Sequence, residues 1–204
     1  MKHRLILLSL FAAASLARAE IFDAPENVRP LQPPAALPAT SITSLDGASV
    51  SLRELLSGQP TILVVYRGGW CPYCTKQLGG LQKILPELHA LGYRLVALSP
   101  DPIEQLKKTL TAEKLDYTLL SDPTFASIDA MGLAFALDEK TIGKYKGYGI
   151  PLYSPPGSDA RVLPVPAVFL TDREGRITFT HTNPDYTQRL ATESLLKAAR
   201  RLGN

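Results

Sequence analysis

The chain has 204 residues, of which 45% are apolar and 20% charged, and this composition suits one globular domain with a sizeable core. Its formal charge is +3, but residues 1–19 hold three of the 22 basic residues and none of the 19 acidic ones, so residues 20–204 are neutral overall. This balance gives no electrostatic support for a nucleic-acid or anionic-membrane partner.

Residues 1–19 have the features of a secretory signal peptide. Lys2 and Arg4 precede an apolar run over 5–14, and Ala17-Arg18-Ala19 forms an A-x-A cleavage site. We expect cleavage after Ala19, no stable membrane span afterwards, and export to the bacterial periplasm or secretion. The alternative is an uncleaved N-terminal anchor.

Residues 20–39 contain five prolines and predict an extended, poorly structured leader to a single domain over 40–204. Within that domain, Ser51 is placed to cap a short helix that runs to Leu56. The apolar run "TILVVY" over 61–66 shows no alternation, which predicts a strand buried on both faces.

A helix is expected directly after the two cysteines. Cys74, Leu78, Leu81, Leu85 and Leu88 follow one another at intervals of four and three residues, which makes one apolar stripe on a helix. A proline at position 86 is expected to kink this helix.

The rest of the chain alternates strands and helices and ends with a hairpin and a helix. We expect a strand at 93–99, a helix at 102–115 with Asp101 as N-cap, a strand at 117–122, a helix at 124–131, a loop at 138–164, a hairpin at 168–180 and a helix at 190–202. This order predicts an α/β fold with a mixed central sheet flanked by helices.

Cys71 and Cys74 are the only cysteines, and their spacing favours redox chemistry over a structural disulfide. A disulfide between them would close too short a loop to stabilise the fold much. We expect Cys71 at the N-cap of the helix and Pro72 at its first position, so that helix N–H groups and the helix dipole favour an exposed Cys71 thiolate. Cys74 lies on the apolar stripe and is expected to be a buried resolving thiol.

A cofactor site is a weaker interpretation of the same cysteines. A zinc site would need two further ligands, and only His89 and His181 remain in the domain, neither of them near a second His or Cys in the sequence. Haem attachment would need a histidine at position 75, which is Thr75. We therefore expect no metal and no other cofactor.

The motif "WCPYC" resembles the thioredoxin superfamily, and "CPYC" is the dithiol of many glutaredoxins. The wider pattern, from about Thr40 to the C-terminus, is most similar to the peroxiredoxin-like alkyl hydroperoxide reductase/thiol-specific antioxidant (AhpC/TSA) family. It rests on "VVYRGGWCPYCTKQL", "LVALSPD", "VPAVFLTDREGRI" and "NPDYTQR".

The resemblance implies a thioredoxin-like fold, with Cys71 in the nucleophilic or peroxidatic place and Cys74 as the resolving cysteine. It also implies that Pro166 is a cis-proline facing the dithiol, with the backbone of Val165 free to pair with an extended substrate chain. Trp70 is expected beside the dithiol, as a stacking surface for a partner chain or as a hydrophobic cover.

Several positions depart from the family pattern. Peroxiredoxins carry Thr or Ser where this chain has Gly68, and an Arg where it has Pro166, and those two residues activate the peroxide. Thioredoxins keep a buried acid in the strand before the dithiol, and 61–66 contains none, so the general acid or base is unidentified. Arg67 is a candidate stabiliser of the thiolate, with a solvated surface arginine as the equal alternative.

These observations predict an exported antioxidant thiol-disulfide oxidoreductase that cycles a Cys71–Cys74 dithiol and disulfide. Because of Gly68 and Pro166, protein disulfides or dithiols are the preferred substrates, and a reducing thiol donor is the second partner. The alternative is a thiol-dependent peroxidase acting on hydrogen peroxide or alkyl hydroperoxides. A lesser alternative is a redox-inert binding module with a thioredoxin fold.

Overall fold

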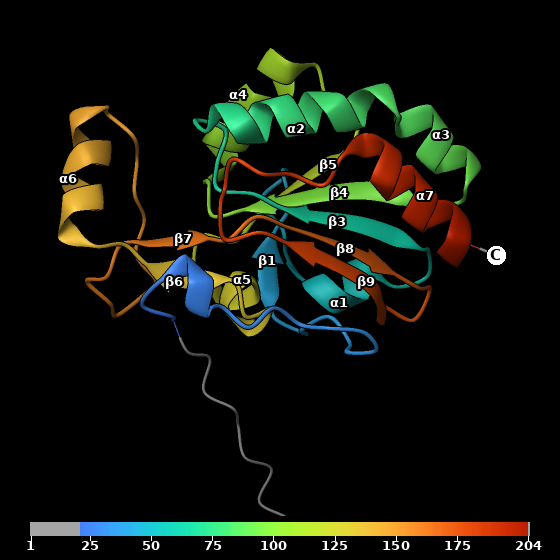
Figure 1. Cartoon of the computed structure of the whole chain (residues 1–204), viewed down its shortest axis with the longest axis horizontal. Helices are drawn as coiled ribbons and strands as arrows, with labels where there is room; N and C mark the ends of the chain where they lie inside the picture. The colour runs from blue at the N-terminus through green and yellow to red at the C-terminus, as the bar shows by residue number, and fades with distance from the viewer. Residues whose placement is uncertain (1–20, 204) are drawn as a thin grey trace, which may run out of the picture.

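A seven-stranded mixed sheet forms the centre of the computed structural model, which describes residues 21–203 (Figure 1). Its strand order is β2-β1-β5-β4-β3-β8-β9. The strands are β1 Ser41–Thr43, β2 Ser49–Ser51, β3 Thr61–Val65, β4 Arg94–Ser99, β5 Thr118–Ser121, β8 Ala167–Thr171 and β9 Ile177–Thr182. β3, β4 and β5 run parallel, whereas β8 pairs antiparallel with both β3 and β9. This arrangement confirms the predicted α/β class.

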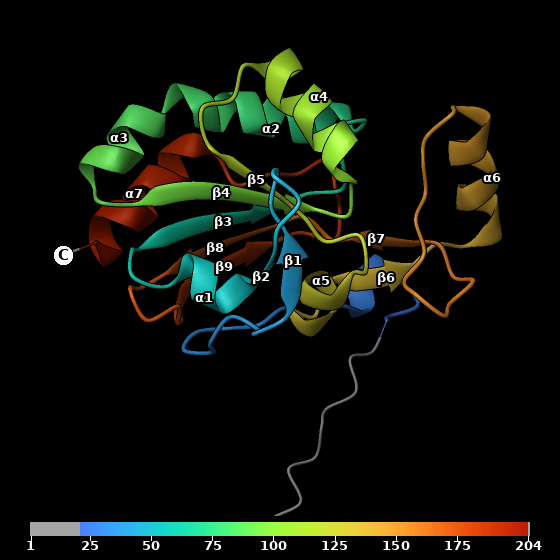
Figure 2. The ribbon, with the colours of Figure 1, turned by 180° about the vertical axis from the view of Figure 1, so that it is seen from behind.

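Helices cover both faces of the sheet, as Figures 1 and 2 show from opposite sides. One face carries α2, α3, α4 and α7, and the other carries α1 and α5. The helices are α1 Leu52–Leu56, α2 Pro72–Lys83, α3 Leu85–Ala90, α4 Ile103–Glu113, α5 Ala126–Ala130, α6 Glu139–Gly147 and α7 Thr192–Leu202, with a short 3₁₀ turn at Pro25–Asn27. In the described part of the chain, none of them has the length and apolar character needed to cross a bilayer. The predicted signal peptide at 1–19 lies outside the described residues.

β3 contributes to two separate cores. Ile62 and Val64 pack with α2 and α7 on one face of the sheet, and Leu63 and Val65 pack with α1 and α5 on the other. Every residue of the strand is buried, as its unbroken apolar run predicts. Because β3 is a central strand buried on both faces, it gives rigid support to the loop that leads to Cys71.

The predicted helix after the cysteines is confirmed, including its break. All five residues of the apolar stripe are buried on one core. The helix ends at Lys83, and α3 begins at Leu85 with Pro86 in its first turn, where a missing N–H leaves no intrahelical bond unmade. Ser51 caps α1 through the Glu54 N–H, also as predicted.

The proline-rich segment differs from the prediction of a poorly structured leader. It is largely irregular, but it packs against the domain, and Leu37 is fully buried in the core beneath α1. The Leu37 N–H donates to the Gly175 carbonyl at 3.0 Å, and Phe22 pairs with Phe135. The prolines prevent regular structure without preventing burial.

The predicted loop at 138–164 is wrong in two places. It contains α6, with Asp138 as N-cap, and strand β7 Val162–Pro164, which pairs with β6 Ala134–Ala136 in a separate two-stranded sheet. Figure 1 shows α6 standing beside the main body, at the left of the view. The helix is anchored by Tyr145, its one buried residue.

Candidate active site

Cys71 lies where β3 and its following loop meet α2. It is the N-cap of that helix with φ −91° and ψ 114°, and Pro72 occupies the first helical position, both as predicted. The N–H groups of Cys74 and Thr75 donate to the Cys71 carbonyl at 2.9 and 3.0 Å. The first turn of α2 therefore begins at the nucleophile candidate and places Cys74 one turn away.

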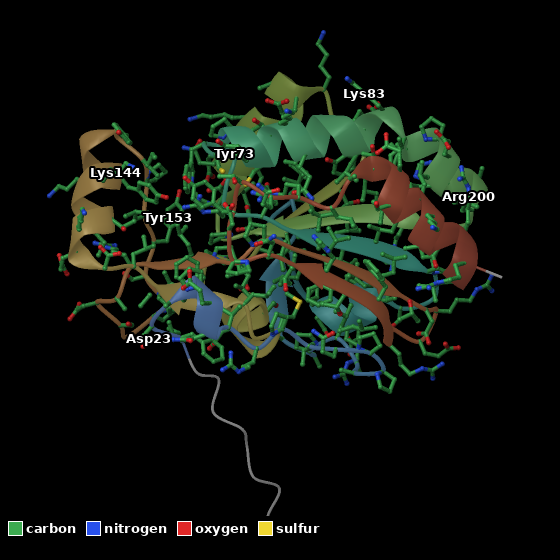
Figure 3. All side chains as sticks on the ribbon, in the orientation of Figure 1. Asp23, Tyr73, Lys83, Lys144, Tyr153 and Arg200 are labelled. Atoms are coloured by element: carbon green, nitrogen blue, oxygen red, sulfur yellow. The ribbon has the colours of Figure 1, made fainter. Side chains whose placement is uncertain are left out.

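Both cysteines are buried, so the predicted exposure of Cys71 is wrong. Cys71 is 1% exposed and Cys74 is fully buried, and both belong to the core between the sheet and α2. The exposed residue of the motif is Tyr73, between them, at 43%. In Figure 3 Tyr73 lies at the end of α2 that faces α6.

The two thiols differ in acidity. A hydrogen bond from the Cys74 thiol, helped by the charges of Arg67 and Arg189, lowers the pKa of Cys71 to about 6. Cys74 donates that bond and lies in the core, so its own pKa is raised well above the usual range. These directions favour Cys71 as the thiolate and Cys74 as the protonated partner.

Arg67 is buried at 3% exposure, so the alternative of a solvated surface arginine is wrong. Its Nη2 donates to the Tyr145 hydroxyl at 2.6 Å, and its guanidinium lies 4.0 Å from the Tyr186 ring centroid and 5.1 Å from that of Trp70. Among the described residues, no carboxylate forms a salt bridge with it. A buried, unpaired cation raises the potential around Cys71 and favours its thiolate.

Arg189 is a second cation at the site, and sequence reasoning missed it. It lies in the segment between β9 and α7, and its Nη2 approaches the Cys74 sulfur at 3.6 Å. Its sequence separation from Cys74 is 115 residues, so only the "NPDYTQR" resemblance could have drawn attention to it.

Asp101 is a buried acid that contacts the loop before Cys71. Its predicted role as N-cap of α4 is wrong, because Pro102 holds that position. Instead its Oδ2 accepts the Gly69 N–H at 2.7 Å, and burial raises its pKa to about 6. The acid comes from the end of β4, beside β3, and not from β3 itself.

Gly68 has a conformation and a setting that exclude a larger residue. Its φ is +146°, and a Cβ there would lie 2.4 Å from Trp70 Nε1 and 2.8 Å from Asp101 Oδ1. A threonine or serine hydroxyl, which the resemblance expects at this place, therefore has no room. Any group that activates a substrate must come from elsewhere in the site.

The predicted cis bond before Pro166 is also wrong. Among residues 21–203 the Pro33–Pro34 bond is the only cis peptide. The Val165 N–H donates to the Leu133 carbonyl at 2.9 Å, and the chain passes directly from β7 into β8. The Val165–Pro166 peptide bond that joins the two strands is trans, which is the favoured form before proline. The Val165 N–H is already bonded and is not free to pair with a substrate chain.

Unpartnered buried polar atoms gather around the dithiol. Five of the described residues with such an atom lie in the loop before Cys71 or contact that loop or Cys74, with the atoms Tyr66 Oη, Arg67 Nε, Trp70 Nε1, Asp101 Oδ1 and Arg189 Nε. Three of these atoms carry N–H groups that can only donate. Such groups are rare in folded proteins, and a catalytic or redox role is one of the reasons for them.

Comparisons with known proteins point in the same direction as this geometry. The model of the AhpC/TSA family matches residues 33–180. A protein of Mycobacterium tuberculosis assigned as a peroxiredoxin is 28% identical over 161 residues, which cover 79% of this chain and 91% of that protein. The peroxiredoxin Bcp of Escherichia coli is 30% identical over 106 residues, covering 52% of this chain and 67% of Bcp.

Solved structures with the same fold come from this group of proteins. Peroxidoxin BcpB of Mycobacterium tuberculosis superposes with a TM-score of 0.60 at 18% identity, covering 82% of this chain and 97% of that one. Reduced Prx3 of Vibrio vulnificus, solved in complex with hydrogen peroxide, gives 0.68 at 17% identity, covering 83% and 99%. At these identities the likeness establishes the thioredoxin-like fold.

Proposed function

The chain belongs to the AhpC/TSA family and is a thiol-dependent oxidoreductase, and from this premise we propose that it is a peroxidase in which Cys71 reduces a hydroperoxide. The preference for protein disulfides, drawn from Gly68 and Pro166, gives way to the alternative that the comparisons favour. The observation that carries the proposal is a set of buried N–H donors without hydrogen-bond partners near Cys71, whose thiol has a lowered pKa.

The donors offer what the missing family residues would supply. A hydroperoxide attacked by a thiolate develops negative charge on the departing oxygen, and positioned donors in a buried site stabilise such charge. Arg67 and Arg189 each keep a buried Nε–H without a partner, and Trp70 keeps its Nε1–H. We assign peroxide activation to the two arginines, with Trp70 beside them.

The chemical cycle balances with two cysteines and an external thiol. The Cys71 thiolate attacks one peroxide oxygen and the O–O bond breaks, so that Cys71 becomes a sulfenic acid and the departing oxygen takes a proton and leaves as an alcohol or water. The Cys74 thiol then attacks the Cys71 sulfur, water leaves, and a Cys71–Cys74 disulfide forms. A thiol donor supplies two electrons and two protons to restore the dithiol.

Export is part of the proposal and rests on the sequence of residues 1–19. Those residues carry the basic start, apolar run and A-x-A site of a signal peptide. A periplasmic or secreted location would place the peroxidase where external oxidants enter.

A matched pair of variants tests the proposal. After one equivalent of hydrogen peroxide, Cys74→Ser should hold a Cys71 sulfenic acid that dimedone labels, and wild type should instead lose two hydrogens as the disulfide. Cys71→Ser should give no adduct at Cys74. Mass spectrometry of the intact proteins and their peptides measures the products in wild type and both variants. A Cys71 that stays unlabelled and unoxidised in Cys74→Ser would refute the proposal.

Exchange with protein disulfides is the second candidate, because an exposed aromatic pair adjoins the dithiol. Tyr73 and Tyr186 are 43% and 38% exposed, and their rings pack edge to face with their centroids 5.7 Å apart. Such a pair offers a stacking surface to a partner chain. Mixed disulfides trapped by Cys74→Ser from oxidising extracts, without sulfenic acid after peroxide, would favour this candidate.

A further inference from the structure

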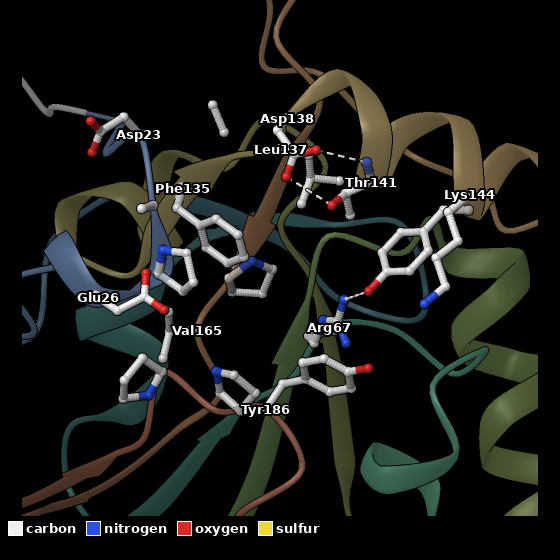
Figure 4. A pocket seen from close by; sticks show the side chains of 17 residues that line it. Asp23, Glu26, Arg67, Phe135, Leu137, Asp138, Thr141, Lys144, Val165 and Tyr186 are labelled. Carbon is white, nitrogen blue, oxygen red and sulfur yellow. Dashed lines mark hydrogen bonds between the residues drawn. The ribbon is translucent and has the colours of Figure 1, made fainter.

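A cavity of about 450 Å³ lies between residues 23–26, α6 and the start of β8, and Arg67, from the loop that leads to Cys71, lines it. Figure 4 shows the side chains that line it. Its volume is within the range of small-molecule sites. Phe135, Val165, Tyr145 and Tyr186 give it apolar and aromatic walls.

The cavity has opposite charges on opposite sides. In Figure 4 Asp23 and Glu26 lie on the left, on the N-terminal segment, and Arg67 and Lys144 lie on the right. A third carboxylate, Asp138, is already engaged by the Thr141 N–H and hydroxyl, both at 2.8 Å, and the Oδ1 of Asp23 accepts the Asn27 side-chain N–H at 2.6 Å, which leaves the Oδ2 of Asp23. Glu26 and Lys144 form no salt bridge among the described residues, so both are free for a ligand.

The cationic side of the cavity adjoins the dithiol. Arg67 lines the cavity and also lowers the pKa of Cys71 by its charge. Tyr186 lines it too, stacks on Arg67, and touches Tyr73 of the CPYC motif. Neither cysteine lines the cavity itself, so the thiol of a seated ligand would reach Cys71 past the Arg67–Tyr186 corner.

We propose that this cavity binds the reductant of the enzyme, a small zwitterionic thiol of the cysteinyl-peptide class, with its carboxylate toward Lys144 and Arg67 and its ammonium toward Asp23 and Glu26. The inference rests on the thiol-dependent cycle proposed for Cys71 and Cys74. The complementary charges select the class, since an uncharged thiol or a simple alkyl hydroperoxide would leave both charged walls without a partner.

The reduction step balances with two ligand molecules. The thiolate of the first attacks the Cys71 sulfur, the Cys71–Cys74 bond breaks, and Cys74 leaves and takes a proton. The thiolate of the second attacks the ligand sulfur of the mixed disulfide, releasing the ligand disulfide and the Cys71 thiolate. The two thiols together lose the two electrons that the protein disulfide gains.

Binding can be tested apart from chemistry with S-methylglutathione, which has the charges of a cysteinyl peptide and no free thiol. Calorimetric titration should show binding to wild type, weakened about tenfold in Lys144→Glu and in Glu26→Lys. Lys146→Glu and Glu139→Lys, exposed on α6 outside the cavity, are the charge-matched controls and should bind like wild type. No binding at millimolar concentration, or equal weakening in the controls, would overturn the inference.

Kinetics supply the second readout. With disulfide-form protein, the ratio of the reduction rate by glutathione to that by uncharged 2-mercaptoethanol should fall in Lys144→Glu and stay unchanged in Lys146→Glu. An unchanged ratio in Lys144→Glu would overturn the inference. If peroxide never produces the disulfide form but S-methylglutathione binds as expected, the proposed peroxidase fails and the cavity assignment stands.

Discussion

At the scale of single residues, the acidity of Cys71 depends first on Cys74. The hydrogen bond from the Cys74 thiol is the largest cause of the lowered Cys71 pKa, ahead of the two arginine charges. The resolving residue thus has a role before it forms any disulfide: it stabilises the thiolate that begins the cycle.

Two substitutions at Cys74 separate this role from resolution. Cys74→Ala removes the donor and should raise the Cys71 pKa clearly above the value of about 6, whereas Cys74→Ser keeps an O–H donor and should raise it less. Iodoacetamide labelling rates of Cys71 across pH measure both. Identical profiles for the two variants would show that the hydrogen bond has no such effect.

Asp101 should make stability depend on pH in an unusual direction. Its folded pKa is about 6, above the ordinary 3.8, so the folded state binds the extra proton and the contribution of Asp101 to stability falls as pH rises from about 4 through 6. Asp101→Asn removes this titration, so the stability of the variant relative to wild type should increase by at most about 3 kcal/mol across that window. Urea unfolding at several pH values measures it.

A matched carboxylate gives the control for Asp101. Hydrogen bonds from Ser44 and Ala48 lower the pKa of exposed Asp46, so Asp46→Asn should show a slope of the opposite sign. A flat difference between Asp101→Asn and wild type would mean that Asp101 titrates in the folded protein as it does in the unfolded chain.

At the scale of elements, local sequence patterns correctly predicted the features that depend on neighbouring residues. The stripe from Cys74 to Leu88 and the Ser51 cap are confirmed because a helix stripe and a cap depend on neighbours three or four residues away. α6 was missed because only Tyr145 of its residues is buried, which leaves no apolar stripe, and Gly143 lies within it. Its visible signal was the Asp138 cap.

α6 depends on one buried tyrosine for its place beside the site. Tyr145→Phe removes the hydroxyl that accepts from Arg67, which should cost roughly 1 kcal/mol and speed amide hydrogen exchange across 139–147. Tyr148→Phe, at 69% exposure on the same segment, is the control. Unchanged exchange in Tyr145→Phe would show that other contacts hold α6.

At the scale of the whole molecule, the site is assembled by contacts that a sequence cannot display. Asp101 meets Gly69 across 32 residues, Arg67 meets Tyr145 across 78, and Arg189 meets Cys74 across 115. The sequence therefore predicted the fold class and the cysteine pair. It did not predict that Asp101 and Arg189 lie at the site. The predicted cis-proline failed because it was transferred from a motif, whereas the local backbone follows the β7–β8 link.

The proline-rich segment should behave as part of the folded domain. Leu37 is fully buried beneath α1, so Leu37→Ala should lower the free energy of unfolding by about 2–5 kcal/mol. Gln32→Ala, exposed in the same segment, should change it by less than about 0.5 kcal/mol. Thermal and urea unfolding measure both, and similar values for the two would mean that the segment is only loosely attached.

The most direct test of the account compares two oxidants on one reduced protein. Trp70, the only tryptophan, precedes Cys71 and packs against the same core, so its fluorescence should follow the oxidation state of the dithiol in a stopped-flow instrument. We predict that hydrogen peroxide oxidises the dithiol to the Cys71–Cys74 disulfide faster than an equal concentration of a peptide mixed disulfide does. Faster reaction with the mixed disulfide, with no disulfide formed by peroxide, would contradict the peroxidase assignment.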